Sequence, residues 1–169
     1  MPAESKQLAI LKALTVHLEG ATTVAGVSMI GRVFRGRMVF GAEMPLPSMS
    51  ILEAPRPDDG FTAGEEQVKR SEEWVLLLQG WADDRGPHPT DAAYDLKATV
   101  EERLSDIVAV DAGGLPVFPE TYLLGGRITK LVVSPGIVRP ADTQISAKAF
   151  FYLPIRLGLV VDIRTPFVG

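Results

Sequence analysis

Apolar residues recur along this chain with two different periods, and each change of period marks an expected element. Between Ser5 and Glu19, leucines recur every three or four residues and predict a helix with one apolar stripe. The stripe consists of Leu8, Leu11, Leu14 and Leu18. Gly20 is expected to end the helix, because glycine accepts the left-handed conformation that is common at helix C-termini.

The next part of the chain has the pattern of β-strands. Val27–Phe34 and Met38–Phe40 flank the sequence Arg35-Gly36-Arg37. This arrangement predicts a hairpin whose glycine supplies the positive φ that a tight turn requires. A further short strand is expected at Met49–Glu53, after a segment that prolines keep out of a ladder.

Ala54–Glu73 differs in character from its neighbours. It contains two prolines, two glycines, six acidic residues and three basic residues. We expect a long solvated loop, of the kind that is usually functional or mobile in compact domains. Trp74–Trp81 follows as a strand with apolar residues at both odd and even positions, which is typical of a central strand covered on both faces. Helices are expected to cover one of those faces.

A second helix is expected to begin at Thr90 or Asp91, where either side chain can act at the helix N-terminus. Its apolar stripe continues to about residue 109, and the polar, glycine-rich Asp111–Gly114 is expected to end it. The stripe consists of Ala93, Leu96, Val100, Leu104 and Ile107.

The last third of the chain is again β-like. Ile128–Ser134 predicts one strand, and every odd position of Ala147–Ile163 is apolar, which is the clearest alternation in the sequence. Fully extended at ~3.3 Å per residue, this stretch would span about 56 Å. A domain of this size has a radius of gyration of roughly 15 Å. We therefore favour a break at Pro154 into two strands; the alternative is a segment that reaches a neighbouring subunit.

These elements predict a fold of the α+β class in one domain covering residues 1–169. We expect a mostly antiparallel or mixed β-sheet, two helices packed on one face, and a long loop at about 54–73 between strands. A chain of 169 residues buries roughly 70% of its unfolded surface, so it needs no disulfide or metal to fold.

Composition narrows the chemistry. The chain has no cysteine, which excludes disulfides, thiolate nucleophiles and cysteine-ligated zinc. His17 and His88 are its two histidines, and neither lies in a metal-ligand spacing. Adjacent aspartates at 58–59 and 83–84 are typical of solvated turns. The sequence lacks a G-x-S-x-G elbow and a phosphate-binding loop. We therefore expect no metal, no cofactor and no enzymatic activity.

One enzymatic alternative remains open. A small hydrolase or ligand-binding domain could use His88 as a base with Asp83 or Asp84 as its partner. This hypothesis requires a deep polar pocket that contains His88, with the carboxylate of Asp83 or Asp84 within hydrogen-bonding distance of the imidazole.

Charge and hydropathy bear on partners and location. The net charge of -4 gives no global basic footprint for phosphate binding. The longest apolar run, Leu157–Val161, is too short to span a bilayer. Residues 1–12 are interrupted by charges and lack the apolar core of a signal peptide. We expect a soluble protein made in the cytoplasm, without a membrane partner.

Exposed arginine and tryptophan side chains are the candidate binding residues. Arg32, Arg35 and Arg37 surround the expected hairpin and could contact a phosphate or an acidic partner. The alternative is a solvated strand face. Trp74 is expected in the core, whereas Trp81, at a strand end, could be half exposed at an interface, where tryptophan is over-represented.

Several of these segments together resemble the tail terminator (tail completion) proteins of long-tailed bacteriophages. The resemblance spans roughly residues 8–110, and the last 60 residues match only in their general β character. Its motifs are structural rather than catalytic. They are Gly31–Gly41, Pro45–Pro57, Trp74–Trp81 and His88–Tyr94 with the helix that continues to Ile107.

The resemblance implies a virion protein, assembled in the host cytoplasm, that forms a hexameric ring at the head-proximal end of the tail tube. Such a ring stops tube polymerisation and joins the tail to a head connector or neck protein, while DNA passes through its lumen without specific binding. A neck or head-completion protein, or another tail ring subunit, is the alternative. The candidate subunit or partner interface consists of Arg32, Phe34, Arg35, Arg37, Trp81 and Arg156.

Overall fold

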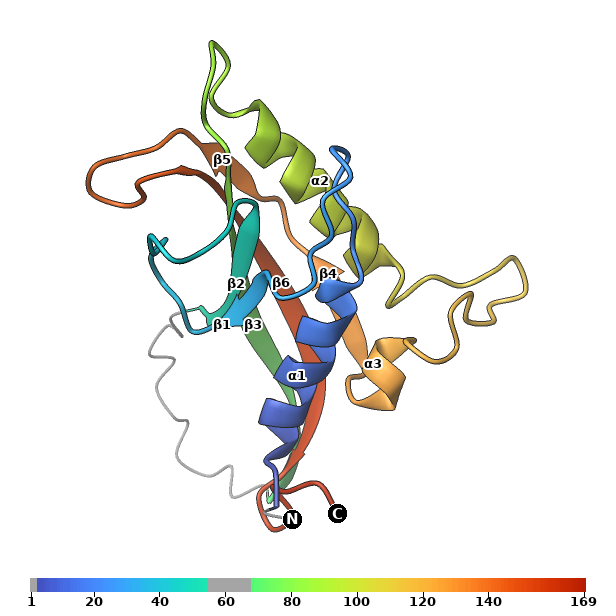
Figure 1. The fold of residues 1–169 in the computed structure, drawn as a ribbon. Coiled ribbons are helices and arrows are strands. Elements are labelled where there is room, and N and C mark those ends of the chain that lie inside the picture. The colour runs from blue at the N-terminus through green and yellow to red at the C-terminus, as the bar shows by residue number, and fades with distance from the viewer. Residues whose placement is uncertain (1–2, 55–67) are drawn as a thin grey trace.

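A six-stranded mixed sheet forms the centre of the protein (Figure 1). The computed structural model describes residues 3–54 and 68–169. The strands are β1 (Val33–Arg35), β2 (Ser48–Glu53), β3 (Lys69–Ala82), β4 (Lys130–Val133), β5 (Ile137–Arg139) and β6 (Ala149–Asp162). Their order is β1-β2-β3-β6-β4, and β5 also pairs with β6. Only the β1–β2 pair of this sheet is parallel.

Two long helices cover one face of this sheet. They are α1 (Lys6–Glu19) and α2 (Asp91–Ser105), and the short helical turn α3 (Leu123–Gly126) lies beside them. Side chains from both long helices join β2, β3 and β6 in one buried cluster. The predicted α+β class, with a mostly antiparallel sheet and helices on one face, is confirmed.

The long antiparallel pair β3–β6 lies at the centre of the sheet, and its register overturns one prediction. All 14 residues of β6 pair with β3, from Ala149 opposite Ala82 to Asp162 opposite Lys69. The expected break at Pro154 is therefore wrong. The Pro154 carbonyl accepts the Ser134 N–H at 3.0 Å, so its missing N–H faces the gap between β4 and β5, where no strand needs that donor.

An unbroken β6 fits within the domain for a geometric reason. A strand extends across the whole diameter of a domain, which is more than twice its radius of gyration. The molecule is elongated along β3 and β6, so both strands fit within it (Figure 1). The alternation itself was read correctly, because Ala149, Phe151, Leu153, Ile155, Leu157 and Leu159 are all buried under the helices.

The predicted hairpin around Gly36 is wrong. Of Val27–Phe34, only residues 33–34 belong to a strand, and Met38–Phe40 belong to none. Gly31 and Gly36 both have φ near +70° (72° and 73°), so each bends the chain out of an extended path. The intervening β1 pairs in parallel with β2 instead of folding back on its own neighbour.

The loop expected at 54–73 ends earlier than predicted, because β3 already begins at Lys69. Residues 69–73 are the first part of β3 and pair with residues 158–162 of β6. Positions 55–67 lie outside the described residues. Trp74–Trp81 is central in the sheet as predicted, but residues 74–77 are buried on one face only.

Helix α1 begins where the sequence predicts, with the Ser5 hydroxyl accepting the Leu8 N–H at 3.1 Å. Its buried face differs from the predicted stripe, because Ile10 and His17 are buried and Leu8 is exposed. Gly20 ends the helix with φ of -72°, not in the left-handed conformation. A Cβ there would lie 2.4 Å from Arg103 Nη2, so the glycine provides room for this guanidinium.

His17 and Arg103 connect the two helices. His17 Nε2 lies 2.6 Å from the Arg103 carbonyl oxygen, and Arg103 Nε donates to the His17 carbonyl at 2.8 Å. Burial of the imidazole lowers the pKa of His17, and the nearby Arg103 charge acts in the same direction. Helix α2 buries its predicted stripe, but it ends at Ser105 rather than at about residue 109.

A second, smaller cluster lies on the other face of the sheet. Trp81, Phe150 and Met44 are buried there, with Phe34 and Tyr152 packed around them. The cover comes from the 36–47 segment instead of from a helix. Among the residues that the structure describes, this face is covered at the Ala82 end of β3, and further along it Val160 and Arg156 are exposed.

Candidate subunit interface

The three predicted arginines bind three different partners. Arg32 Nη1 donates to the carbonyl oxygens of Leu46 and Pro47, at 2.9 and 3.1 Å. Arg35 donates to the Thr15 hydroxyl of α1 at 2.9 Å. The structure therefore does not combine these side chains into one basic patch, because Arg32 and Arg35 stabilise the chain around β1.

Arg37 and Phe34 lie together on the outer face of the sheet. The Arg37 guanidinium lies 4.8 Å from the centre of the Phe34 ring and 2.5 Å from Glu43 Oε1. The cation thus covers an aromatic ring and is also paired with an acid. Two hydrogen bonds lower the pKa of the exposed Glu43 carboxyl: the larger effect comes from its own backbone N–H and the smaller from Arg37.

Trp81 and Arg156 have opposite exposures. Trp81 is 0% exposed, so the prediction of a half-exposed tryptophan is wrong. It packs with Phe40 and Phe150 beneath residues 36–47. The sequence pattern does not predict that this segment covers the end of β3. Arg156 is exposed on the outer face of β6, 3.5 Å from Glu73 Oε1.

The sequence reading missed a projecting hairpin at residues 107–121, which we call the arm. In Figure 1 it extends to the right, away from the sheet. Backbone hydrogen bonds hold it, including Val117 N–H to the Ala109 carbonyl and Asp111 N–H to the Leu115 carbonyl. Asp111 Oδ1 also accepts the N–H groups of Gly113 and Leu115 at 2.8 and 3.0 Å, which closes the turn.

Beyond Ile107, which is buried in the main core, the arm exposes large apolar side chains. Leu115 is 66% exposed, and four more large hydrophobic residues share this exposure. These are Val108, Val110, Val117 and Phe118. A signal was present in the sequence, because a glycine pair flanked by alternating apolar residues is a hairpin pattern. The apolar stripe before it predicts only that Asp111–Gly114 ends a helix.

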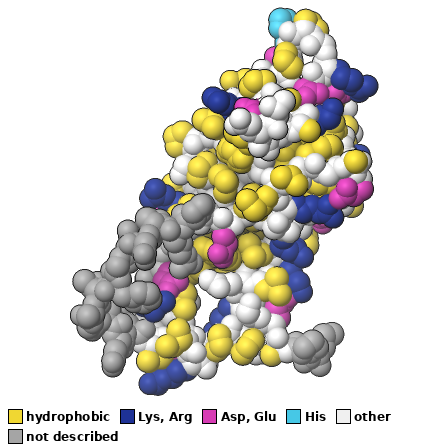
Figure 2. Space-filling view, turned by 90° about the vertical axis from the view of Figure 1, so that its left-hand side faces the viewer, with side chains coloured by type: hydrophobic (Ala, Val, Ile, Leu, Met, Phe, Trp, Pro, Cys, Tyr) yellow, Lys and Arg dark blue, Asp and Glu magenta, His cyan; other side chains and the backbone are white. Residues whose placement is uncertain are grey.

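Two loops on the opposite side of the molecule form a second exposed apolar surface. They are residues 36–47 and 139–148, which we call the loop face, and they project to the left in Figure 1. Met38, Val39 and Ile145 are exposed on them. Figure 2, which views this side directly, shows hydrophobic side chains gathered over its upper middle, with charged side chains around them.

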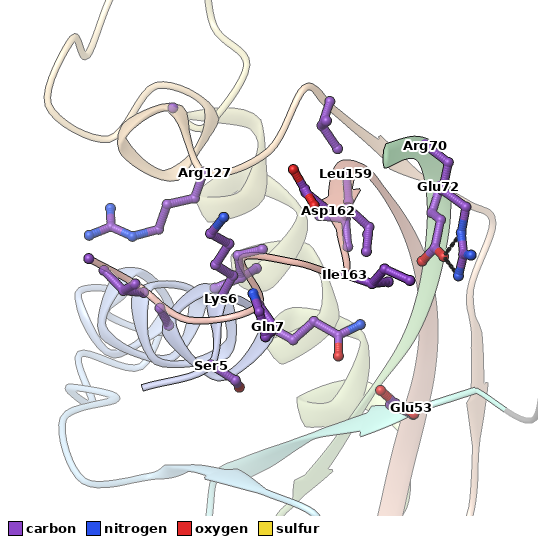
Figure 3. A pocket seen from close by; sticks show the side chains of 18 residues that line it. Ser5, Lys6, Gln7, Glu53, Arg70, Glu72, Arg127, Leu159, Asp162 and Ile163 are labelled. Carbon is purple, nitrogen blue, oxygen red and sulfur yellow. Dashed lines mark hydrogen bonds and ion pairs between the residues drawn. The ribbon is translucent and has the colours of Figure 1, made fainter. Parts of the chain in front are cut away.

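A cavity of about 770 Å³ lies between the start of α1, the end of β6 and α3. Figure 3 shows Lys6 and Arg127 on one side and the Arg70–Glu72 ion pair across from them. Its charged groups are engaged within the chain: Arg127 donates to the Leu124 carbonyl, and Glu53 accepts from Trp74 Nε1. No histidine is among the residues that line this cavity.

The residues of the hydrolase reading do not form an acid–base pair. Asp83 binds the Arg85 guanidinium at 2.6 Å, and these hydrogen bonds lower the pKa of Asp83 to about 2. Asp84 accepts the Ala149 N–H at 3.3 Å. His88 is exposed and does not line the cavity beside α1. Among the described residues, no cluster of three or more histidine, cysteine or carboxylate side chains could hold a metal ion.

Comparison with known protein families finds none that matches this chain, and comparison with curated proteins finds no similar sequence. In residues 3–54 and 68–169, no helix is long and apolar enough to cross a membrane.

Proposed function

We propose that this chain is the subunit of a homohexameric ring that terminates a bacteriophage tail tube. The ring caps the head-proximal end of the tube, stops its polymerisation, and joins the tail to a head connector or neck protein. The resemblance of residues 8–110 to tail terminator proteins is the sequence basis of this proposal. The net charge of -4 supports it, since an acidic subunit would not retain passing DNA through phosphate binding.

One structural observation carries the proposal: two exposed apolar surfaces, the arm and the loop face, project from opposite sides of one chain. Exposed apolar residues that gather on one surface often mark a binding site. Two different surfaces on opposite sides favour a head-to-tail contact between copies, which closes into a ring when the rotation allows it.

Assembly of the purified full chain tests ring formation. Light scattering at increasing protein concentration, with negative-stain micrographs, should show rings of roughly 109 kDa, six times the chain mass of 18.2 kDa. If the ring requires the tube as a template, sixfold density of this chain should appear at the head-proximal end of the tail in virions. A strict monomer that is also missing from the tail–head joint would reject the proposal.

A genetic test separates the terminator from a neck or head-completion protein, which would also form a ring. Loss of a terminator leaves tube growth unchecked, so a nonsense mutation in its gene should give overlong tubes. Tails of normal length that fail to attach to heads would assign the chain to the neck. Normal, infectious virions would reject both roles.

A further inference from the structure

Our further inference concerns how one copy of this chain contacts the next, and it rests on the proposed function. We propose that the arm of one copy (residues 107–121) docks onto the loop face (residues 36–47 and 139–148) of its neighbour. The contact is head-to-tail, so each copy gives its arm to one neighbour and receives the arm of the other.

The arm is held in shape by its own hydrogen bonds, but within the described chain its large apolar side chains stay exposed. Its hydrogen bonds and the Asp111 cap fix the hairpin, yet an isolated hairpin has no second layer in which to bury side chains. Leu115 and Val117 therefore stay exposed within one chain. Burying apolar surface is favourable by about 25 cal/mol per Å², so an apolar partner surface would stabilise the contact.

Charge favours the loop face as the partner. The arm contains two acidic residues, Asp111 and Glu120, and no basic residue. The loop face contains three basic residues and two acidic residues. Its bases are Arg37, Arg139 and Lys148. Two arms would bring only negative charges together, which disfavours a symmetric arm-to-arm contact.

Glu120 on the arm and Arg139 on the loop face can define the pairing, because Asp111 and Asp142 already accept backbone N–H groups within their own loops. Within the described part of the chain, Glu120 and Arg139 are exposed and make no ion pair, whereas Arg37 pairs with Glu43 and Lys148 with Asp84. Exposed pairs contribute little affinity but select orientation and partner. Glu120 opposite Arg139 thus gives the apolar contact a direction.

Site-specific cross-linking tests this contact, because the natural chain has no cysteine to react. The variant Leu115→Cys/Met38→Cys places one thiol on each surface, and a bismaleimide with a flexible spacer connects thiols that lie close together. We expect a ladder of covalent oligomers up to the hexamer. Either single variant should give only background dimers. In a head-to-tail contact, residue 115 of one copy does not lie near residue 115 of the next, and the same holds for residue 38.

The matched control is Leu115→Cys/Val24→Cys. Val24 is 79% exposed and apolar, but it lies outside both surfaces. Rings in micrographs with no more ladder from the Met38 pair than from the Val24 pair would overturn the contact and leave the proposed function intact. Absence of any ring, in solution or at the tail, would reject the proposed function first.

Substitutions provide a second readout. Leu115→Asp should weaken association about tenfold or more, as expected for an apolar anchor at an interface. Val24→Asp should change it by less than about twofold. Glu120→Lys and Arg139→Glu should each weaken assembly, and the double variant should recover it. Equal effects of the two aspartate substitutions, or no recovery in the double variant, would contradict the docking.

Discussion

Trp74 and Trp81 lie seven residues apart in β3 and on opposite faces of the sheet, and their surroundings differ. Trp74 lies under the helices in the large cluster, and its indole N–H donates to Glu53 Oε1 at 3.0 Å. Trp81 lies in the small cluster on the other face, and its buried indole N–H has no partner among the described residues. The two indoles thus differ in hydrogen bonding, although both are fully packed.

The difference shows how the two faces are covered. Two helices with regular apolar stripes bury the inner face along its length. Of the described chain, an irregular segment, residues 36–47, covers one end of the outer face. Beneath this segment the Trp81 indole N–H is buried without a partner among the described residues, and further along the same face Val160 is 50% exposed.

The largest effect should come from cutting a side chain on the inner face. Leu153 is fully buried under the helices, so Leu153→Ala should lower the free energy of unfolding by about 2–5 kcal/mol. Val160→Ala, on the outer face of the same strand, should cost within about 0.5 kcal/mol, because Val160 is 50% exposed. Urea unfolding of the two variants as monomers measures the contrast, and equal losses would show that both faces are equally closed.

A glycine on the inner face provides the next test. A Cβ on Gly80 would lie 2.1 Å from Cε1 of the buried Phe151 ring. Gly80→Ala should therefore cost about 1–3 kcal/mol, through displacement of that ring. In a double-mutant cycle by chemical unfolding, Phe151→Leu should reduce the cost of the alanine. Additive losses would mean that the ring does not limit this position.

Removing each indole N–H sharpens the tryptophan comparison directly. Trp74→Phe removes a hydrogen bond to a carboxylate and should cost about 1.5 kcal/mol. Trp81→Phe removes an unpaired buried donor, so its lost packing is offset and the net change should stay within about 1 kcal/mol. Thermal and urea unfolding measure both, and a larger loss at Trp81 would show that its N–H has a partner.

The smallest effect concerns pH and belongs to the helix layer. Burial lowers the pKa of His17 below its usual value of 6.5, so the unfolded chain binds this proton more tightly than the folded chain. Stability should therefore fall as the pH decreases from above 6.5 towards the folded pKa, and this loss should be smaller in His17→Gln. Unfolding free energies across this range, with an NMR titration of the imidazole, check the prediction. An identical pH dependence in the variant would contradict it.

The predictions from sequence succeeded where a long element carries a regular pattern. The stripe of α2 and the odd positions of β6 are buried as expected, since a period of 3.6 or 2 places those side chains on one face. The predictions failed around Gly31 and Gly36, because two left-handed glycines a few residues apart interrupt an apparently alternating segment. They also failed for Trp81, whose burial depends on a loop that carries no period.

The candidate interface shows the same division. Sequence selected the arginines around β1, but Arg32 and Arg35 are engaged by the Leu46 and Pro47 carbonyls and by Thr15. The sequence pattern does not predict the arm. Val108, Leu115 and Val117 are apolar in the sequence, but their exposure is known only from the fold. Whether such residues are core or surface depends on what lies next to them in space.

Local period and side-chain polarity are enough to predict the α+β class, the two helices and the inward face of the long strands. Three features become visible in the fold alone: β6 continues through Pro154, residues 36–47 cover Trp81, and the arm is exposed within the described chain. These features depend on contacts between residues far apart in the chain. No local pattern records such contacts, and they determine which apolar surfaces remain for a neighbouring copy.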